Sequence, residues 1–497
     1  MMSVTLSKSR YLTGCQCPRR LWLRSHMPDV AAAPPAAQAR RFAAGTEIGR
    51  RAHALFPGGV LVDEDALRHR EAVERTRALL AGGNVPAIFE AAFLHAGVRS
   101  RVDILERLGD GAWGLREVKS AASVKEEHLH DVALQRFVLE GSGLRVPSLE
   151  VIHVNSGYVR GDGEIDWPRY FHRQDVTARV APLRSDVPAR VQFLHAVLAL
   201  DASPAIEPAR HCDTPRACEF WTHCTRDKPA DWVFHLPKRP DRFEALRAAG
   251  IERIADIPDD FPLSGKQERV RSVLREGRAF VSTGLAAALA PAGPPACYLD
   301  FETMGPPIPL YPGTRPYQRI PFQWSLHRLD PAGVLEHQEF LASGRIDPRR
   351  EFVATLLDAL SDRPEPILVY SRFEADVLGE LAGAVPERAA ALAGLRARLV
   401  DLLRVVQGHV YHPAFGGSFS LKAVAPALVP GFGYSDLEGV AGGDEAAGAF
   451  AAIAQGEMSE AEEARVRSAL RVYCERDTLA LVELHKALRE RVCATLV

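Results

Sequence analysis

The sequence contains no apolar run long enough to cross a bilayer, and its first residues lack the apolar core of a secretory signal peptide. It also lacks an excess of either charge: 61 Lys and Arg stand against 63 Asp and Glu. The resulting net charge of −2 neither requires nor excludes a nucleic-acid partner, because a balanced chain can still carry a local basic surface. We therefore expect a cytoplasmic protein without a membrane partner.

Cysteine is scarce, with eight residues in a chain of 497. In a reducing cytoplasm these are expected to be thiols or metal ligands rather than disulfides. The apolar and charged fractions are ordinary for a globular protein, and no internal repeat is visible. A chain of this length exceeds one hydrophobic core and predicts two or three domains.

Helical patterns surround short apolar stretches that are expected to be strands. These stretches lie at 87–94, 101–108, 113–118, 149–154, 297–303, 320–328 and 367–370. Small helices are expected over 237–280, where Ser264 and Gln267 form a capping-box pattern, and a long closing helix is expected from Ser459. We therefore predict an α/β protein with two mixed-sheet domains.

The domain limits follow from the same patterns. The expected domains are 1–235 and 296–497, and a small helical connector, 236–295, joins them. A short basic segment near the start is a candidate nucleic-acid surface, although a solvated helix face explains it equally well. It contains Lys8, Arg10, Arg19, Arg20 and Arg24.

A first carboxylate constellation lies in the N-terminal domain. Asp103 falls on one expected strand, and Glu117 and Lys119 alternate on the next, so that these two side chains share a face. Two carboxylates can hold Mg²⁺ or Mn²⁺, and a lysine can orient the attacking water. The alternative is a surface strand with an ion pair.

Residues 8–226 resemble the RecB-type branch of the PD-(D/E)xK nuclease superfamily. The motif residues occur in the family order, as His53, Glu90, Asp103, Glu117-Val-Lys119 and Gln135. The resemblance implies a restriction-endonuclease-like domain in which His53, Asp103 and Glu117 bind metal. It further implies that Lys119 orients water and that Gln135 supports the site. The branch usually has an aromatic residue four positions after the glutamine, where this chain has Leu139.

Three evenly spaced cysteines follow the expected nuclease core, at Cys212, Cys218 and Cys224. A distant cysteine, Cys17, supplies a fourth thiolate, with Cys15 as the alternative. Four thiolates suit an iron–sulfur cluster or a structural zinc ion, and the spacing alone does not choose between them.

This arrangement is similar to the iron–sulfur RecB-type nucleases, including the CRISPR-associated exonuclease and the AddB-like helicase–nuclease subunits. In those families one cysteine precedes the core and three follow it, so the cluster joins the two ends of the domain. The resemblance favours Cys17, which lies in a family-like CPRRLW context. It also favours a 4Fe–4S cluster over Zn²⁺, although two of the trailing cysteines are usually closer together than here.

A second carboxylate constellation lies in the C-terminal domain. Asp300 and Glu302 alternate on an expected strand, Tyr473 and Asp477 lie four apart on the closing helix, and Glu374 enters another helix. Acids that converge from a strand and two helices can hold two divalent cations around a phosphodiester. Tyr473 could then orient the nucleophilic water.

These residues resemble the tyrosine-bearing DEDD exonucleases of the ribonuclease H-like fold. Asp300-x-Glu302 matches the first motif and Tyr473-x-x-x-Asp477 the last, while Glu374 stands where an aspartate is usual. Asp401 also follows the group's order and is often structural in such enzymes. Lys422 could approach a phosphate, or could be an ordinary exposed lysine.

The whole chain looks similar to a bacterial family of RecB-like nucleases that carry a C-terminal domain of unknown function. The resemblance implies a metal-dependent nuclease with two Mg²⁺ or Mn²⁺ sites. Single-stranded DNA ends in repair, recombination or defence are the expected substrate, RNA is possible for the C-terminal half, and a helicase or repair protein is a possible partner. The alternative is a non-catalytic or single-site nucleic-acid-binding subunit whose cluster is structural or redox-sensing.

Overall fold

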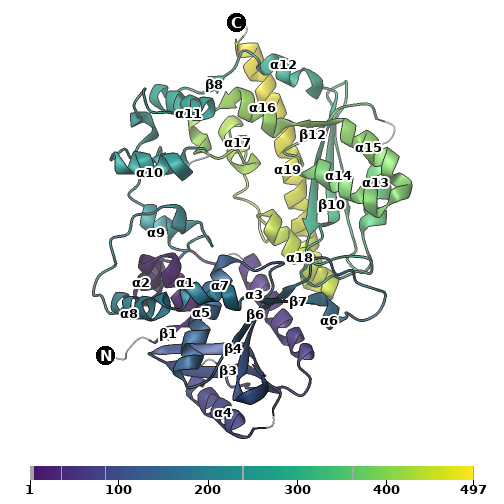
Figure 1. Ribbon diagram of the computed structural model, residues 1–497. Helices are drawn as coiled ribbons and strands as arrows, with labels where there is room; N and C mark the ends of the chain where they lie inside the picture. The colour runs from purple at the N-terminus through teal and green to yellow at the C-terminus, as the bar shows by residue number, and fades with distance from the viewer. Residues whose placement is uncertain are drawn as a thin grey trace. The chain divides into compact units, whose positions relative to one another are not determined.

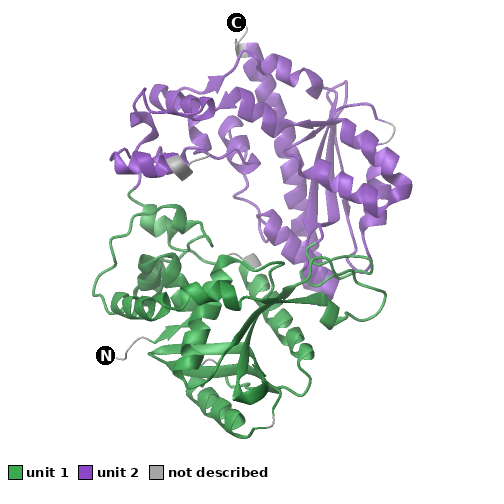
Figure 2. Ribbon diagram, in the orientation of Figure 1, with its two compact units in different colours: residues 1–227, 307–317 green, residues 228–306, 318–497 purple. Residues whose placement is uncertain are grey.

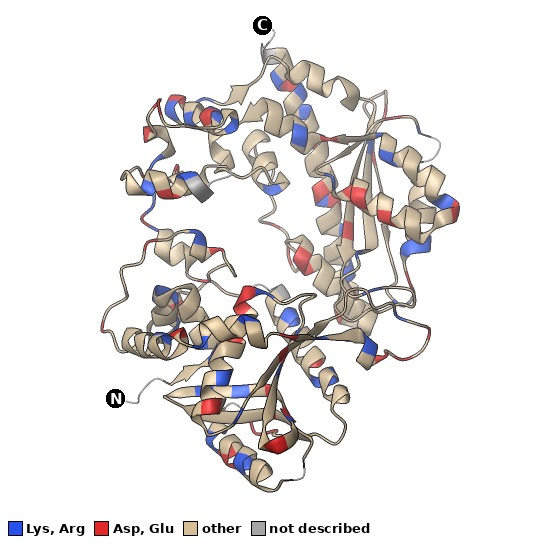
Figure 3. Cartoon of the chain, in the orientation of Figure 1, with Lys and Arg blue, Asp and Glu red and all other residues tan. Residues whose placement is uncertain are grey.

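The computed structural model describes residues 5–34, 36–65, 67–83, 85–237, 240–360 and 363–495. It is a mixed α/β structure, as predicted (Figure 1). The chain forms two compact units: unit 1 comprises 1–227 and 307–317, and unit 2 comprises 228–306 and 318–497 (Figure 2). Lys and Arg are interspersed with Asp and Glu over both units (Figure 3).

The unit boundaries differ from the expected domain limits at two places. The division falls after residue 227 rather than after 235, and the expected connector, 236–295, lies within unit 2. The loop 307–317 returns to unit 1, where Arg160 donates hydrogen bonds of 2.8 Å to the carbonyls of Pro309 and Leu310. The hydroxyl of Tyr170 likewise donates to Pro307 O at 3.0 Å. These bonds satisfy loop carbonyls that no regular element pairs.

Unit 1 is built on a seven-stranded sheet in the order β2-β3-β4-β5-β6-β7, with β1 paired to β4. The β3, β4 and β5 strands are antiparallel neighbours, and β5 and β6 run parallel. The central strands are buried on both faces, and they bury the polar side chains of Arg116, Glu117 and His153 together with their apolar ones. The strands are β1 (Leu6–Ser7), β2 (Val60–Leu61), β3 (Ala87–His95), β4 (Val98–Arg107), β5 (Trp113–Lys119), β6 (Ser148–Val154) and β7 (Phe171–Asp175).

Helices cover this sheet, and one of them matters most for the site. The helix α5 packs on β3, β4 and β5, and buries most of its length in the main core of the unit. The parallel step from β5 to β6 requires such a crossover helix. The helices are α1 (Lys8–Gln16), α2 (Pro18–His26), α3 (Ala36–Ala52), α4 (His69–Ala81), α5 (Glu126–Gly141), α6 (Trp167–Tyr170), α7 (Thr177–Val180), α8 (Asp186–Leu198) and α9 (Trp221–Thr225).

Unit 2 contains a five-stranded mixed sheet in the order β11-β10-β9-β12-β13, and a small β14-β8 ladder. The central strand β9 is apolar except where Asp300 and Glu302 interrupt it on one face. Its β9–β10 and β10–β11 pairs are antiparallel, and β12 is parallel to β9 and β13. The strands are β8 (Phe280–Val281), β9 (Ala296–Met304), β10 (Ile320–Leu329), β11 (Leu335–Leu341), β12 (Ile367–Val369), β13 (Leu399–Asp401) and β14 (Val410–Tyr411).

The long helix α19 packs along β9, β10 and β11. Two buried hydrogen bonds fix it there: Gln323 donates to Leu470 O at 2.9 Å, and the Tyr298 hydroxyl lies 2.9 Å from Nδ1 of His485. The helices are α10 (Pro240–Ala248), α11 (Gly265–Glu276), α12 (Leu285–Leu289), α13 (Arg349–Leu360), α14 (Phe373–Ala384), α15 (Ala389–Ala397), α16 (Leu402–His409), α17 (Leu421–Leu428), α18 (Gly443–Gln455) and α19 (Glu460–Thr495).

The seven strands expected from the sequence are all confirmed, with ends that differ by a few residues. The expected capping box of Ser264 and Gln267 is present before α11, and Ser459 and Glu462 form a second capping box before α19. The strand β11 was not predicted, because its exposed polar face lacks the apolar pattern of a buried strand. No helix within the described ranges is both long and apolar enough to span a membrane.

The close contact between Gly417 and the backbone of His235, both in unit 2, can be tested by substitution. This residue has φ +80°, and a Cβ built on it would lie 2.0 Å from the carbonyl oxygen of His235. Gly416 also has a positive φ, +55°, but open space surrounds it. We expect Gly417→Ala to lower the free energy of unfolding by about 1–3 kcal/mol more than Gly416→Ala, because only the former adds a backbone clash to the conformational cost. Urea unfolding measures both, and equal losses would contradict the contact.

Candidate functional site

In unit 1, three elements bring the predicted residues together. Asp103 lies on β4, while Glu117 and Lys119 lie on the neighbouring strand β5. Asp103 accepts a 2.7 Å hydrogen bond from the backbone nitrogen of Val118, which fixes it beside Glu117. The fully buried Gln135 of α5 donates to Glu117 Oε2 at 2.6 Å. The predicted acids, lysine and glutamine therefore share one site.

Two further residues complete this site, and sequence reasoning missed both roles. Asp131 lies one helical turn before Gln135 and accepts hydrogen bonds from Lys119, at 2.6 Å, and from Gln135, at 2.9 Å. Lys8, the first residue of α1, donates to Glu117 Oε1 at 2.8 Å. Lys119 donates to the same oxygen at 2.5 Å. The i, i+4 spacing of Asp131 and Gln135 was a usable signal, whereas nothing local ties Lys8 to Glu117.

The electrostatics of this site are those of carboxylates balanced by two built-in cations. Burial alone would raise the pKa of Glu117, but Lys119 and Lys8 outweigh it and hold that pKa well below its usual range. Burial and the negative charge of Glu117 raise the pKa of Asp103 to about 8. The same two causes raise the pKa of Asp131. Lys8 and Lys119 thus keep Glu117 ionised, while Asp103 and Asp131 are left harder to ionise.

Two other residues of the predicted motif are the proposed ligand His53 and Glu90, for which no ligand role is predicted. His53 stacks on Phe89, with ring centroids 3.9 Å apart. Glu90 falls opposite Asp103 in the β3–β4 register, has a left-handed backbone with φ +55°, and lies 3.4 Å from Arg101. Among the described residues, His53, Glu90, Asp103 and Glu117 do not bring three ligand atoms within 4.8 Å of one another.

The four predicted cysteines line one small pocket. Cys17 is the residue that precedes α2, Cys224 lies on α9, and the backbone nitrogen of Cys218 donates to Cys212 O at 2.8 Å. Burial raises the pKa of all four thiols. In the part of the chain that the structure describes, no three of these sulfurs lie within 4.8 Å of one another. Cys15 does not line the pocket.

In unit 2, the ligand atoms of Asp300, Glu302 and Asp477 lie within 4.8 Å of one another. The alternation of β9 places Asp300 and Glu302 on the face that α19 covers, and α19 supplies Asp477. Burial and the charge of Asp477 raise the pKa of Glu302 to about 8, and the same causes raise the pKa of Asp300 well above its usual range. Mutual repulsion at this distance is what a bound cation relieves.

Glu374 and Asp401 lie beside this group without joining it. Glu374 lies in the first turn of α14 and is buried, and one of its carboxylate oxygens has no hydrogen-bond partner in the described residues. Burial raises its pKa to about 8, and its charge raises the pKa of Asp300 and Glu302 in turn. Asp401 instead caps α16 by accepting from the backbone nitrogens of Leu403 and Arg404. Its geometry is that of a structural residue.

Aromatic and basic groups border the carboxylates of unit 2. Burial and the charge of Asp477 raise the pKa of Tyr473 and of Tyr434. The ammonium of Lys422 lies 4.6 Å from the ring centre of Tyr473 and 5.4 Å from that of Tyr434. The thiol of Cys474 donates to Asp300 at 3.5 Å. Tyr434 and Cys474 were not expected here, because an isolated tyrosine and an apolar-face cysteine carry no motif.

The comparisons with known proteins identify one domain. A family model described as a domain of unknown function (DUF2779) matches residues 297–420, a segment that contains Asp300, Glu302, Glu374 and Asp401 but ends before Tyr473 and Asp477. The solved crystal structure of SSO0001 is 13% identical, with 41% of this chain and 88% of that chain covered, at a TM-score of 0.18 that supports no argument about the fold. No curated protein matches the chain.

The role of Lys8 as a counter-ion can be tested by Lys8→Met. We expect the free energy of unfolding of unit 1 to fall by about 1–3 kcal/mol, because Glu117 and Asp131 lose one of two cations. The loss stays below that of a fully buried pair, since Lys119 remains and the Lys8 side chain is 27% exposed. Mg²⁺ is expected to restore part of it. Arg10→Met, on the same helix, is the matched control in urea unfolding. Indistinguishable midpoints for the two variants would contradict the role.

Proposed function

We propose that the chain is a metal-dependent nuclease that hydrolyses phosphodiester bonds of DNA, mainly at single-stranded ends. The observation that carries this proposal is the convergence of Asp300, Glu302 and Asp477. Three buried or half-buried carboxylates from a strand and a helix repel one another, and the positive charge of Lys422 does not prevent their pKa values from rising. Oxygen-only ligands of this kind suit Mg²⁺ or Mn²⁺.

The residues of unit 2 divide the work of such a reaction between them. Asp300, Glu302 and Asp477 would hold the metal, with Glu374 near enough to share a second ion. A bound Mg²⁺ or Mn²⁺ lowers the pKa of water and stabilises charge on the phosphoryl oxygens. Tyr473, beside Asp477, can orient the attacking water by a hydrogen bond, and Lys422 can approach a phosphate from the rim.

Unit 1 offers a second site of the same chemical type. Asp103 and Glu117 would bind a cation, and Lys119 would orient the attacking water. Gln135 supports Glu117 by its 2.6 Å hydrogen bond. Any cation there competes with Lys8 for the same oxygen of Glu117, since Lys8 donates to it at 2.8 Å. His53, whose ring stacks on Phe89, would be a further ligand of this cation.

The competition between a metal ion and Lys8 for Glu117 favours a second candidate function, in which only unit 2 cleaves and unit 1 binds nucleic acid. Glu117 in unit 1 already has two ammonium partners, Lys8 and Lys119. In the described part of unit 2, the ammonium of Lys422 acts on Glu302 and Asp477 through its charge, while its direct contacts are with the tyrosine rings and the carbonyl of Ala441. Whether both units cleave or unit 1 only binds, the proposal is a nucleic-acid-processing protein of the cytoplasm.

We further propose that Cys17, Cys212, Cys218 and Cys224 hold a 4Fe–4S cluster, with Zn²⁺ as the alternative. A zinc ion with bonds of about 2.3 Å needs sulfurs about 3.8 Å apart. No three of the described sulfurs lie within 4.8 Å of one another, so a zinc ion would have to draw the thiols together. The pocket joins the start of α2 to the segment around α9, where Gln16 donates to His211 O at 2.7 Å and Arg20 pairs with Glu219. The cluster would therefore be structural or redox-sensing.

The substrate and partner assignments follow from the same proposal. The DEDD exonucleases that the motifs of unit 2 resemble thread a single strand into their sites, so single-stranded DNA is the proposed substrate, and RNA is possible for unit 2. A helicase or repair protein that exposes such strands is the proposed partner.

Cleavage can be tested with end-labelled DNA and RNA, single-stranded and duplex, in Mg²⁺ or Mn²⁺. We expect Asp300→Asn to lower the rate of the unit 2 site by about 10²–10³-fold, because a lost metal ligand removes several kcal/mol of transition-state stabilisation. Glu336→Gln, an exposed acid of the same unit, is the matched control and should cleave normally. If Asp300→Asn cleaves at the rate of the control, the carboxylates of unit 2 are not a catalytic site.

The unit 1 site is tested separately by Lys119→Ala. If both sites cleave, this variant should lose activity on one of the substrates that Asp300→Asn still cleaves, because each site is expected to act alone. Arg179→Ala, an exposed cation on α7, is the control. Unchanged cleavage of every substrate by Lys119→Ala would leave unit 1 with a binding role only, and the absence of metal-dependent cleavage by the unmodified chain would reject the enzymatic proposal.

The metal of the cysteine pocket has its own test. A full-length protein purified without oxygen should be brown and contain about four irons per chain, as a 4Fe–4S cluster requires. Cys218→Ser should lose the iron and the colour, because serine is a poor ligand for such a cluster. Cys15→Ser, outside the pocket, is the matched control and should retain both. A colourless protein with stoichiometric zinc would overturn the iron–sulfur assignment.

A further inference from the structure

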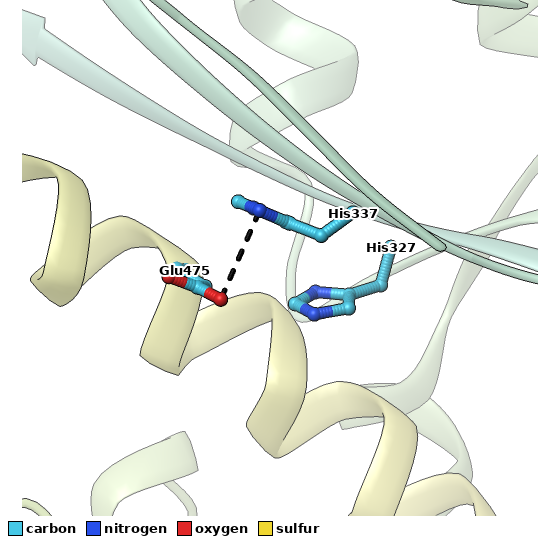
Figure 4. A group of neighbouring side chains, drawn as sticks. All are labelled: His327, His337 and Glu475. Atoms are coloured by element: carbon cyan, nitrogen blue, oxygen red, sulfur yellow. Dashed lines mark ion pairs between the residues drawn. The ribbon is translucent and has the colours of Figure 1, made fainter. Parts of the chain in front are cut away.

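A second group of potential metal ligands lies in unit 2, on the side chains of His327, His337 and Glu475 (Figure 4). The two histidines face each other across the β10–β11 ladder, and their ring centroids are 4.5 Å apart. Glu475 reaches them from α19, with its Oε1 3.8 Å from Nδ1 of His337. One ligand atom of each residue lies within 4.8 Å of the other two.

A chain of hydroxyl groups holds both rings. Nδ1 of His327 lies 2.8 Å from the hydroxyl of Thr478, and Nε2 of His337 lies 2.9 Å from the hydroxyl of Ser325. These two hydroxyls are themselves 2.8 Å apart. The Thr478 hydroxyl also reaches the carbonyl of Glu475 at 3.0 Å. Each imidazole is therefore anchored by one nitrogen, the arrangement that orients metal-bound histidines in proteins.

The direction of the hydrogen bonds in this series determines which imidazole nitrogens keep a free lone pair. With its one proton donated to the Glu475 carbonyl, Thr478 accepts from Ser325 and from Nδ1–H of His327. Ser325 then accepts from Nε2–H of His337. The lone pairs of His327 Nε2 and His337 Nδ1 remain, and within the described residues neither atom makes a hydrogen bond. His337 Nδ1 is the nitrogen that faces Glu475, at a distance too long for a hydrogen bond.

The ligand types and their spacing select a class of metal. Two imidazoles and one carboxylate suit Zn²⁺ and the other borderline first-row ions, whereas Mg²⁺ prefers oxygen ligands alone. Tetrahedral zinc with bonds of about 2.0–2.1 Å needs ligand atoms about 3.4 Å apart, close to the 3.8 Å found between His337 and Glu475. The side chains of His337 and Glu475 are 23% and 48% exposed, so an ion can enter from solvent.

We propose that His327, His337 and Glu475 form a binding site for a borderline transition-metal ion, represented by Zn²⁺, separate from the carboxylate group of unit 2. The ion would tie α19 to β10 and β11. Since Ser325 stands opposite Asp300 in the β9–β10 register and Thr478 follows Asp477, the site also fixes the position of the helix that carries Asp477. The proposal stands whether or not the chain cleaves nucleic acid.

The test is a calorimetric titration of the full-length protein with Zn²⁺ alone, after dialysis against a chelator and with Mg²⁺ present to occupy the oxygen-only sites. Glu475→Gln is compared with Glu339→Gln, an acid of β11 that pairs with Arg471 and lies outside the site. We expect Glu475→Gln to lose one equivalent of Zn²⁺ or to bind it at least about tenfold more weakly, since even outer hydrogen-bond partners of metal-bound histidines contribute about 10–100-fold. Glu339→Gln should bind as the unmodified protein does.

A second variant and a second ion separate loss of the proposed site from misfolding of the variant and from metal binding by the cysteine pocket. His337→Gln should lose the same equivalent, and circular dichroism checks that each variant is folded. Co²⁺ bound at the proposed site should give ligand-field bands that Glu475→Gln abolishes, without the sulfur-to-cobalt charge transfer that cysteines produce. Zn²⁺ stoichiometry and affinity that are equal in the unmodified protein, Glu475→Gln and His337→Gln would overturn the proposal.

Discussion

The repulsion between carboxylates that are packed together away from water is the constraint on which both candidate sites depend. Each such group is costly to ionise unless a cation lies close to it. In unit 1 the protein supplies its own cations, and Lys8 and Lys119 both donate to the buried Glu117. In unit 2 the acids Asp300 and Glu302 have no comparable partner within the described residues, and their pKa values rise. The same constraint therefore has two different solutions in one chain.

The helix α19 determines most of what unit 2 can do. A two-residue step along a helix turns the side chain by roughly 200°, so neighbouring acids such as Glu475 and Asp477 leave the helix in different directions. Asp477 joins the carboxylates of β9, and Glu475 reaches the histidines of β10 and β11. Buried hydrogen bonds near both ends of the contact, from Gln323 and Tyr298, keep the helix in one register on the sheet. A single rigid element thus places two groups of potential ligands.

The sequence predicted those parts of the sites that follow a local periodicity. The alternation of Asp300 and Glu302, and the four-residue spacing of Tyr473 and Asp477, fix which side chains share a face before any tertiary contact is known. Lys8 could not be found in this way, because its contact with Glu117 joins residues 109 positions apart. The unit boundaries could not be predicted for a related reason. The loop 307–317 belongs to unit 1 through hydrogen bonds from distant residues, which its composition does not reveal.

The built-in cations of unit 1 have a consequence for how the two units respond to metal. A divalent ion that binds Glu117 must displace the Lys8 ammonium from the oxygen it now contacts, and the lost ion pair is subtracted from the binding free energy. An ion that binds Asp300 and Asp477 relieves repulsion and displaces no ammonium that the structure describes at these oxygens. If both sites bind metal with ligands of equal intrinsic strength, the site of unit 2 would therefore fill at the lower metal concentration. This order would come from the lysine counter-ions of unit 1, because both sites consist of aspartate and glutamate side chains.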